Sequence, residues 1–314
     1  MIRLLDIQRM SSEDGPGLRT TAFLKGCSLA CTWCHNPESI SMKGEVLWHR
    51  ARCMGCSGCA EDCPQGGISL NEDRLTIDRS RCLGCFTCMR SCPTGAIEAK
   101  GEEISEEQLC AELLKDRAYF GADGGVTLSG GEALLQKESI CLLRMLKESG
   151  VNTAVDTCGQ IGTDTLREAL PYTDVLLYDV KIADSGRHKQ FTGASNELIL
   201  KNLSVAADWT AKGGRLWIRT PIIPGATDSD ENIRDIGEIL AALPKSTETI
   251  ERWELCAFNN LCESKYDSLE KTWIFRNVPL IAKERMNTLA GIACASGACG
   301  DIRITGATAS EREV

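Results

Sequence analysis

Short apolar segments alternate with amphipathic segments along much of the chain. The apolar segments are rich in β-branched residues and predict six strands, which read "TTAFL", "GVTLSGG", "VNTAVDT", "DVLLYDVK", "GRLWIRTPIIPG" and "ERWELCAF". Between them, apolar residues recur at helical spacing and predict helices that include 105–119, 132–149, 196–212 and 228–243. This alternation is typical of parallel βα units. Six strands are too few for a complete eight-stranded barrel, so the pattern predicts an incomplete (β/α)6 barrel or an open parallel sheet.

Residues 45–100 interrupt this pattern, because they contain eight cysteines and little apolar periodicity. Two stretches in this region, "CMGCSGCAEDCPQGGISL" and "CLGCFTCMRSCPTGAIEA", repeat one another at an interval of 29 residues. Both read C-x2-C-x2-C-x3-C-P, and such a repeat indicates one compact unit. We therefore expect residues 45–101 to be an insertion. Residues 1–44 and 102–314 then form the two parts of the βα domain, the second ending in a C-terminal helix.

The repeated motif matches the run used by bacterial two-cluster ferredoxins, in which the fourth cysteine of each run ligates the other cluster. On that pattern one 4Fe–4S cluster takes Cys53, Cys56, Cys59 and Cys92, and the other takes Cys82, Cys85, Cys88 and Cys63. Structural zinc sites are the alternative, but they use two separated C-x2-C pairs more often than four consecutive cysteines. Two clusters of this kind favour electron transfer as the role of the insertion.

A second cysteine motif, C-x3-C-x2-C, lies directly after the first predicted strand, in "LKGCSLACTWCHNPE". It consists of Cys27, Cys31 and Cys34. Three thiolates leave one iron of a cubane cluster without a protein ligand. An open position is useful where a small molecule must bind the metal, as at catalytic zinc sites. The spacing therefore predicts a reactive cluster, distinct from the two clusters of the insertion.

Cysteine usage and charge narrow the class of protein. The chain has 18 cysteines, no run of about 18 apolar residues and no signal-like start. In a reducing compartment clustered thiols bind metals rather than form disulfides, so we expect a cytoplasmic protein with no membrane association. A net charge of -9 argues against nucleic acid as a partner. Most cysteines outside the motifs are expected to be small buried hydrophobic residues, and His49 and His188 to be exposed.

The segment "SSEDGPGLRTTAFLKGCSLACTWCHNPES" resembles the N-terminal signature of glycyl radical enzyme activating enzymes, a family of the radical S-adenosylmethionine (SAM) superfamily. The similarity extends to about Tyr266, and Ser28 and Ala30 depart from the usual proline and arginine. The resemblance implies an α/β fold, a partial (β/α)6 TIM-like radical SAM barrel with an inserted bacterial ferredoxin-like di-cluster domain. It also implies that SAM binds the open iron and is reductively cleaved to a 5′-deoxyadenosyl radical. This radical abstracts hydrogen from a glycine of a partner enzyme.

Polar residues at the carboxyl ends of the predicted strands suit this chemistry, because a parallel barrel builds its active site there. Each residue by itself is also compatible with a turn or a surface salt bridge. The resemblance assigns the SAM amino group to Gly130, Gly131 and Glu132. It assigns the rest of the pocket to Trp33, Asp156, Thr157, Asp179, Lys181, Arg219 and Asn259. A monovalent cation is expected at Asp156, Thr157 and Asp179.

Together with that resemblance, the sequence predicts a monomeric oxidoreductase that uses three 4Fe–4S clusters and SAM. Its expected partners are a glycyl radical enzyme, whose glycine loop is the substrate, and a flavodoxin or ferredoxin that supplies electrons. Two other functions stay open: a radical SAM maturase acting on a peptide or small molecule, and a non-catalytic iron–sulfur electron carrier. The sequence selects no particular glycyl radical enzyme. It also leaves open whether the clusters of the insertion relay electrons or serve docking.

Overall fold

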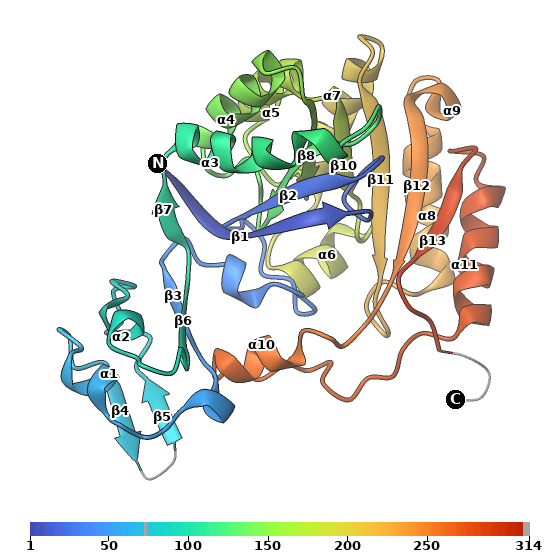
Figure 1. Ribbon diagram of the computed structural model, residues 1–314. Coiled ribbons are helices and arrows are strands. Elements are labelled where there is room, and N and C mark those ends of the chain that lie inside the picture. The colour runs from blue at the N-terminus through green and yellow to red at the C-terminus, as the bar shows by residue number, and fades with distance from the viewer. Residues whose placement is uncertain (72–73, 310–314) are drawn as a thin grey trace.

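The computed structural model describes residues 1–71 and 74–309 and is built around one sheet of nine strands (Figure 1). Their order across the sheet is β13-β12-β11-β10-β9-β8-β2-β1-β7. Neighbouring strands from β2 to β13 are parallel, whereas β1 and β7 extend one edge with antiparallel pairing. The strands are β1 (Ile2–Ser11), β2 (Arg19–Leu24), β7 (Glu102–Ile104), β8 (Gly125–Gly130), β9 (Asn152–Thr157), β10 (Val175–Asp179), β11 (Arg215–Ile222), β12 (Ile250–Ala257) and β13 (Ile302–Thr305).

All six predicted strands are present as the parallel strands β2 and β8 to β12, which confirms the predicted α/β fold. The sheet has a further parallel strand, β13, that the sequence pattern did not predict. Only four residues form it, and Arg303 interrupts its apolar pattern. It pairs with β12, where Leu255 lies opposite Ile304. Because β13 and β7 remain as free ends of the strand order, the barrel is incomplete, as predicted.

Helices pack against the sheet, and apolar side chains from both layers form the main core, for example Leu128 of β8, Leu143 of α4 and Leu203 of α7. Helix α8 begins where Ser229 accepts a hydrogen bond from the backbone N–H of Asn232, which satisfies a donor of the first turn. The helices are α3 (Glu106–Leu113), α4 (Glu138–Glu148), α5 (Thr163–Ala169), α6 (Ser185–Thr192), α7 (Glu197–Thr210), α8 (Asp230–Ala241), α9 (Ser246–Thr249), α10 (Glu263–Ser268) and α11 (Lys283–Ala295).

The inner face of the sheet changes from apolar to polar toward the carboxyl ends of its strands. Ala154, Leu177 and Trp217 belong to a small apolar cluster on this face. Successive side chains of a strand point to opposite faces, so the residues two positions further on return to the same face. Those residues are Asp156, Asp179 and Arg219. The alternation therefore brings charged groups from three neighbouring strands to one end of the barrel interior.

The fully buried side chain of Arg19 fills the barrel interior further from that end. Its guanidinium donates to Thr127 Oγ1 at 2.7 Å, to Val126 O at 2.8 Å and to Asn152 Oδ1 at 3.0 Å. Burial lowers the pKa of Arg19 to about 10. Nearby Gly17 has a φ of +69°, and an added Cβ would lie 2.4 Å from a backbone nitrogen. The "DGPGLRT" part of the signature therefore has a structural role in joining β2 to β8.

Residues 45–101 form a small unit that extends away from the sheet, at the lower left of Figure 1. Strands β3 (Glu45–Trp48) and β6 (Ile97–Lys100) pair antiparallel at its base. Between them lie α1 (Gly58–Glu61), the hairpin of β4 (Ile68–Asn71) and β5 (Arg74–Ile77), and α2 (Thr87–Arg90). Its own apolar cluster contains Val46, Leu75, Ile77, Ile97, Cys59 and Cys88. Over the described ranges, no helix of the protein is long and apolar enough to cross a membrane.

Candidate functional site

A cavity of about 510 Å³ lies at the carboxyl ends of the parallel strands. The three cysteines of the C-x3-C-x2-C motif line it, together with residues that follow β8, β10, β11 and β12. The predicted pocket residues that line it are Trp33, Gly130, Gly131, Asp179, Lys181, Arg219 and Asn259. Three other predicted residues, Glu132, Asp156 and Thr157, lie behind this lining. The structure therefore brings together segments from near both ends of the chain, from Glu13 to Gly306.

The loop with the three cysteines is held by backbone hydrogen bonds on both sides. Cys27 N donates to Ile40 O at 3.0 Å, which closes the loop on itself. Ala30 N donates to the carbonyl of Thr192 at 2.8 Å, at the end of α6. The ring of Trp33 is buried and lies 6.1 Å from the ring of Phe191 of the same helix. Helix α6, which the sequence pattern did not predict, is thus a support of the cysteine loop.

The three thiols have different protonation tendencies in the apoprotein. Burial raises the pKa of Cys31 to about 11 and raises the pKa of Cys34 further. The neighbouring thiol of Cys158 lowers the pKa of Cys27. Iron binds thiolates, so cluster binding must displace the protons of the buried thiols. Soft sulfur ligands around a cavity of this size suit an iron–sulfur cluster.

Gly130 and Gly131 lie where the end of β8 meets the start of the cysteine loop. Gly130 has a φ of +116°, and an added Cβ would lie 2.3 Å from the backbone nitrogen and oxygen of Leu24. An added Cβ on Gly131 would lie 2.3 Å from the carbonyl oxygen of Gly26. Both positions therefore need glycine so that the two backbones can approach.

The fully buried side chain of Glu132 fixes the end of β9 rather than facing the cavity. One oxygen accepts from Leu134 N at 3.1 Å, and the other accepts from Cys158 N at 2.9 Å and from the Cys158 thiol at 3.0 Å. The Thr157 hydroxyl also donates to it, at 2.8 Å. Burial raises the pKa of Glu132, and these donors oppose that shift. Glu132 thereby positions Cys158, which lines the cavity next to Cys27.

A charged network crosses the inner ends of β9 to β12. Arg219 donates to Glu254 Oε2 at 3.1 Å, to Asp156 Oδ2 at 3.4 Å and to Glu13 O at 2.7 Å. Burial opposes ionisation of this guanidinium, but Asp156 raises the pKa of Arg219. Asp156 also accepts from Ser129 Oγ at 2.9 Å, and burial raises the pKa of Asp156 to about 6. The network holds the planar guanidinium in one orientation at the cavity wall.

Lys181 forms an ion pair with Asp179 at the end of β10. Burial disfavours the ammonium, but the Asp179 carboxylate raises the pKa of Lys181. The ammonium is therefore charged at neutral pH and lies at the surface of the cavity. Asn259, in the turn after β12, lines the cavity on the other side, and its Oδ1 accepts from Leu261 N at 3.2 Å.

Several cavity residues were missed by the sequence reasoning. Cys158 and Cys256, which we expected to be small buried hydrophobic residues, both line the cavity, as do Glu13, Phe258 and Thr305. Cys158 directly follows β9, and Cys256 is the last residue but one of β12. The rule that the carboxyl ends of parallel strands carry the site would have found both cysteines. His188, which we expected to be exposed, is buried, and its Nδ1 lies 2.7 Å from Ala194 O.

The eight cysteines of the insertion divide between two small cavities. One is lined by Cys53, Cys56, Cys59 and Cys92, and the other by Cys63, Cys82, Cys85 and Cys88. These are the two sets that the crossed ferredoxin pattern predicts. Within residues 1–71 and 74–309, no three His, Cys, Asp or Glu side chains converge on the position of a single metal ion. A cubane cluster binds its thiolates at separate corners, so four thiols around one cavity suit it.

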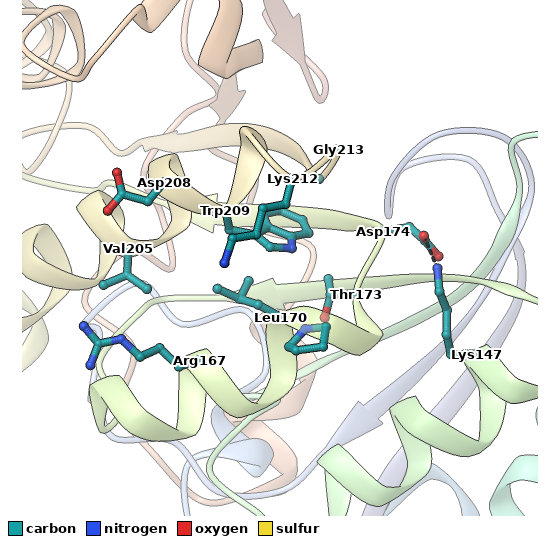
Figure 2. Close-up of a pocket in the computed structure, with 12 residues that line it drawn as sticks. Lys147, Arg167, Leu170, Thr173, Asp174, Val205, Asp208, Trp209, Lys212 and Gly213 are labelled. Atoms are coloured by element: carbon teal, nitrogen blue, oxygen red, sulfur yellow. Dashed lines mark hydrogen bonds and ion pairs between the residues drawn. The ribbon is translucent and has the colours of Figure 1, made fainter.

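A larger cavity, of about 620 Å³, lies at the opposite ends of the strands (Figure 2). Thr173 and Gly213, which line it, precede β10 and β11, and Figure 2 shows Lys147 and Asp174 paired at one side. In parallel barrels, residues at the amino ends of strands serve stability and those at the carboxyl ends serve catalysis. We therefore place the functional site at the cysteine-lined cavity and not at this larger one.

Comparison with known proteins agrees with this geometry. The sequence profile described as "Radical SAM superfamily" matches residues 79–236. Two profiles of iron–sulfur domains, "4Fe-4S dicluster domain" and "4Fe-4S single cluster domain", match residues 52–96 and 13–55.

Three relatives cover most of the chain. The trans-4-hydroxy-L-proline dehydratase activating enzyme of Clostridioides difficile is 38% identical over 91% of this chain and 94% of its own length. The (2S)-3-sulfopropanediol sulfolyase activating enzyme of Bilophila wadsworthia is 39% identical over 88% of this chain and 91% of its own length. The indoleacetate decarboxylase activating enzyme of Tractidigestivibacter scatoligenes is 36% identical over 94% of this chain and 95% of its own length.

The chain therefore belongs to the glycyl radical enzyme activating enzymes of the radical SAM superfamily, which confirms the resemblance seen in its sequence. It is an enzyme that uses SAM and iron–sulfur chemistry, and its protein partner is a glycyl radical enzyme.

Proposed function

We propose that the cysteine-lined cavity binds SAM beside a 4Fe–4S cluster held by Cys27, Cys31 and Cys34. The observation that carries this proposal is that these three thiols line one cavity together with Asp179 and Lys181 at the end of β10 and Arg219 of β11. The cluster and SAM, when bound, supply a 5′-deoxyadenosyl radical that removes a hydrogen atom from a glycine of the partner. The protein binds, orients and shields these reactants.

Each predicted residue receives a role from its position. The backbone carbonyls of Gly130 and Gly131 accept hydrogen bonds from the SAM amino group, because the close packing of these glycines on Leu24 and Gly26 holds them beside the cysteine loop at the cavity. Lys181 attracts the SAM carboxylate, and the oriented guanidinium of Arg219 binds a carboxylate or ribose oxygen. Glu132 does not face the cavity, and its role is to position Cys158 beside the cysteine loop. Trp33 anchors that loop, and Asn259 borders the nucleoside end of the pocket.

A monovalent cation is proposed near Asp156, Asp179 and Thr157. The two carboxylates supply negative charge and oxygen ligands. The Thr157 hydroxyl donates to Glu132 and accepts from Gly159 N at 3.0 Å, which leaves one lone pair for a cation. Potassium dependence of SAM binding is the expected consequence.

We further propose three clusters in total, with the two in the insertion relaying electrons to the site cluster. The two sets of four cysteines, each around one cavity, support this number. The separate apolar core of the insertion supports the proposed division into 1–44, 45–101 and 102–314. The electron donor is a flavodoxin or ferredoxin, and the protein acts as a monomer.

The test is SAM cleavage by the reconstituted protein under anaerobic conditions. With dithionite as reductant, chromatography should detect 5′-deoxyadenosine. Replacing Cys27, Cys31 and Cys34 together by alanine should abolish its formation and leave about eight irons per chain, the content of two 4Fe–4S clusters. Loss of all iron in this variant would contradict the division between a site cluster and insertion clusters. Reducible clusters without 5′-deoxyadenosine in the wild-type protein would indicate an electron carrier.

A further inference from the structure

The side chain of Lys25 is fully buried, and it lies only two residues before Cys27. No other lysine that the structure describes is buried to this extent. The Lys25 backbone is fixed from both sides, because its N–H donates to Arg3 O at 3.0 Å and its carbonyl accepts from Gln136 Nε2 at 3.0 Å. A buried ammonium needs partners that replace water. The partners of this ammonium therefore show what Lys25 holds together.

The first partner belongs to the part of the chain that returns from the cysteine loop, residues 35–40, which we call the returning leg. Lys25 Nζ donates to the carbonyl oxygen of Glu38. In the neighbouring residues, Gly26 N donates to Ser39 O at 2.6 Å. Ser39 also lines the cysteine-lined cavity. The ammonium therefore fastens one wall of this cavity to the end of β2.

The second partner is the first residue of the insertion. The carboxylate of Glu45 lies 3.3 Å from Lys25 Nζ, and the Glu45 side chain is 12% exposed. The last residue of the insertion, Gly101, meets the same lysine, because an added Cβ there would lie 2.0 Å from its Cδ. Figure 1 shows β3, which begins at Glu45, and β6, which ends just before Gly101, side by side at the base of the insertion. Both connections of the insertion to the main domain therefore contact one side chain.

The other ion pairs between the insertion and the main domain are more exposed. In the described ranges these are the pair of Lys100 with Asp6, whose side chain is 65% exposed, and the pair of Lys271 with Glu45, at 3.9 Å. Exposed ion pairs contribute little, because water competes with each partner. Removing one partner of a buried pair is far more disruptive, since it leaves the other charge uncompensated. The contact between Lys25 and Glu45 is thus the ionic link of the insertion that matters most for the cysteine loop.

We propose that Glu45 is a positioning residue for the site cluster, and that it acts through Lys25 to hold the returning leg in place for SAM binding. This inference rests on the proposed function of the three-cysteine motif as the ligand set of that cluster. Without the Glu45 carboxylate, the buried ammonium keeps only the Glu38 carbonyl among the described residues and must shift toward water. This shift displaces the returning leg, together with Cys34 directly before it. The insertion therefore supports the geometry of the cysteine-lined cavity in addition to holding its own clusters.

The test compares Glu45→Gln with Glu98→Gln in the reconstituted full-length holoprotein. Both substitutions remove one carboxylate from the paired strands β3 and β6, but the Glu98 side chain is 40% exposed and pairs with Lys100. SAM binding is measured anaerobically by equilibrium dialysis. Glu45→Gln should raise the Kd of SAM about tenfold at an unchanged iron content, because the buried charge loses its partner. Glu98→Gln should change the Kd by less than about twofold.

Two further variants separate a role of the charge from a general loss of stability. Glu45→Asp keeps the carboxylate and should restore most of the affinity for SAM. In Lys25→Gln/Glu45→Gln, the increase in the Kd should be smaller than the product of the increases in the two single variants, because no buried charge is left unpaired. Single effects that multiply, or a Glu45→Asp variant that binds SAM as weakly as Glu45→Gln, would overturn the proposal.

Hydrogen exchange of the returning leg gives a readout that does not depend on SAM. Mass spectrometry of peptides from 35–40 should show faster exchange in Glu45→Gln than in Glu98→Gln or the wild-type holoprotein. Unchanged exchange, or loss of the insertion irons with an unchanged affinity for SAM, would also overturn the proposal. If the wild-type protein fails to form 5′-deoxyadenosine with dithionite, the proposed function fails, whereas the exchange rates still decide whether Glu45 holds the returning leg.

Discussion

The side chain of Arg219 shows how one residue is prepared for ligand binding by its neighbours. Its guanidinium donates hydrogen bonds to Glu254, to Asp156 and to the carbonyl oxygen of Glu13. A lysine at this position has a single ammonium on a flexible stem and cannot keep these contacts at once. The guanidinium plane at the cavity wall is therefore set by the network and not by Arg219 alone.

Replacing Arg219 with lysine should raise the Kd of SAM about tenfold, because the oriented fork of donors is lost while the positive charge remains. The measurement is equilibrium binding of SAM to the reconstituted holoprotein. Arg215→Lys is the matched control on the same strand, since Arg215 pairs with the exposed Glu251 on the protein surface. A similar increase in the Kd of SAM in both variants would show that the weaker binding results from a change in β11 as a whole and not from the loss of the Arg219 guanidinium.

At the scale of single residues, the sequence predicted which residues belong to the pocket better than it predicted the contacts that they make. The family resemblance assigned Arg219, Asp179 and Lys181 to the pocket, their positions at strand ends suited that assignment, and all three line the cavity. The bond between Glu132 and Cys158 was not predictable, since it joins two loops whose approach depends on the packing of β8 and β9. The prediction that His188 is exposed was wrong. It was based on the polar residues next to His188 in the sequence, which do not show that the ring is buried beside Ala194 O.

Among the elements, the junction between β2 and β8 is the one on which the site depends most closely. The two strands are parallel and in register, with Leu24 opposite Gly130. The cysteine loop leaves the end of β2 there, and the glycine pair leaves the end of β8. Any side chain that separates these backbones also displaces the cysteine loop.

Gly130→Ala should therefore remove the site cluster and keep the two clusters of the insertion. The added Cβ would collide with the backbone of Leu24, and a φ of +116° is strained for alanine. Iron analysis and electron paramagnetic resonance should show about eight irons per chain instead of about twelve. Gly291→Ala in α11 is the control, because its Cβ meets nothing and alanine favours a helix by about 0.5–1 kcal/mol. Normal SAM affinity in Gly130→Ala would contradict this role.

Strong periodic elements were predictable, and short ones were not. The strands β8 to β12 are apolar and separated by amphipathic segments, so the pattern alone identified them. Strand β13 has four residues, and tertiary contacts stabilise it: it pairs with β12, and Ile302 packs against the main core. Helix α4 begins at Glu138 and not at 132, because the residues before it form the loop that packs on the cysteine segment.

On the scale of the whole molecule, the insertion is held to the main domain by few polar contacts. Arg79 joins β3 to the end of α10, since it donates to Val46 O at 2.7 Å as well as to Ser268 O. This attachment sets the distance between the cluster cavities of the insertion and the cysteine-lined cavity of the main domain. The rate of the proposed electron transfer depends on that distance.

Arg79→Ala should loosen the base of the insertion. Loss of one net hydrogen bond of about 1 kcal/mol should raise amide hydrogen exchange in β3 and β6 about fivefold. Mass spectrometry of peptides from 45–48 and 97–100 measures this rate in the holoprotein. Arg50→Ala, the equivalent position of the first half of the repeat, should leave these rates unchanged because its side chain makes no such contact among the described residues. Equal rates in both variants would show that Arg79 does not attach the insertion.

The sequence by itself determined the cofactor class and the kind of fold. Cluster ligands lie close together in the chain, and strand and helix periods are local, so both leave a signature in the order of residues. Only the tertiary structure decided which side chains meet across the sheet, such as Glu132 with Cys158, and which part of the insertion contacts the end of α10. These outcomes depend on the packing of segments distant in sequence, and nothing in a local pattern specifies that packing.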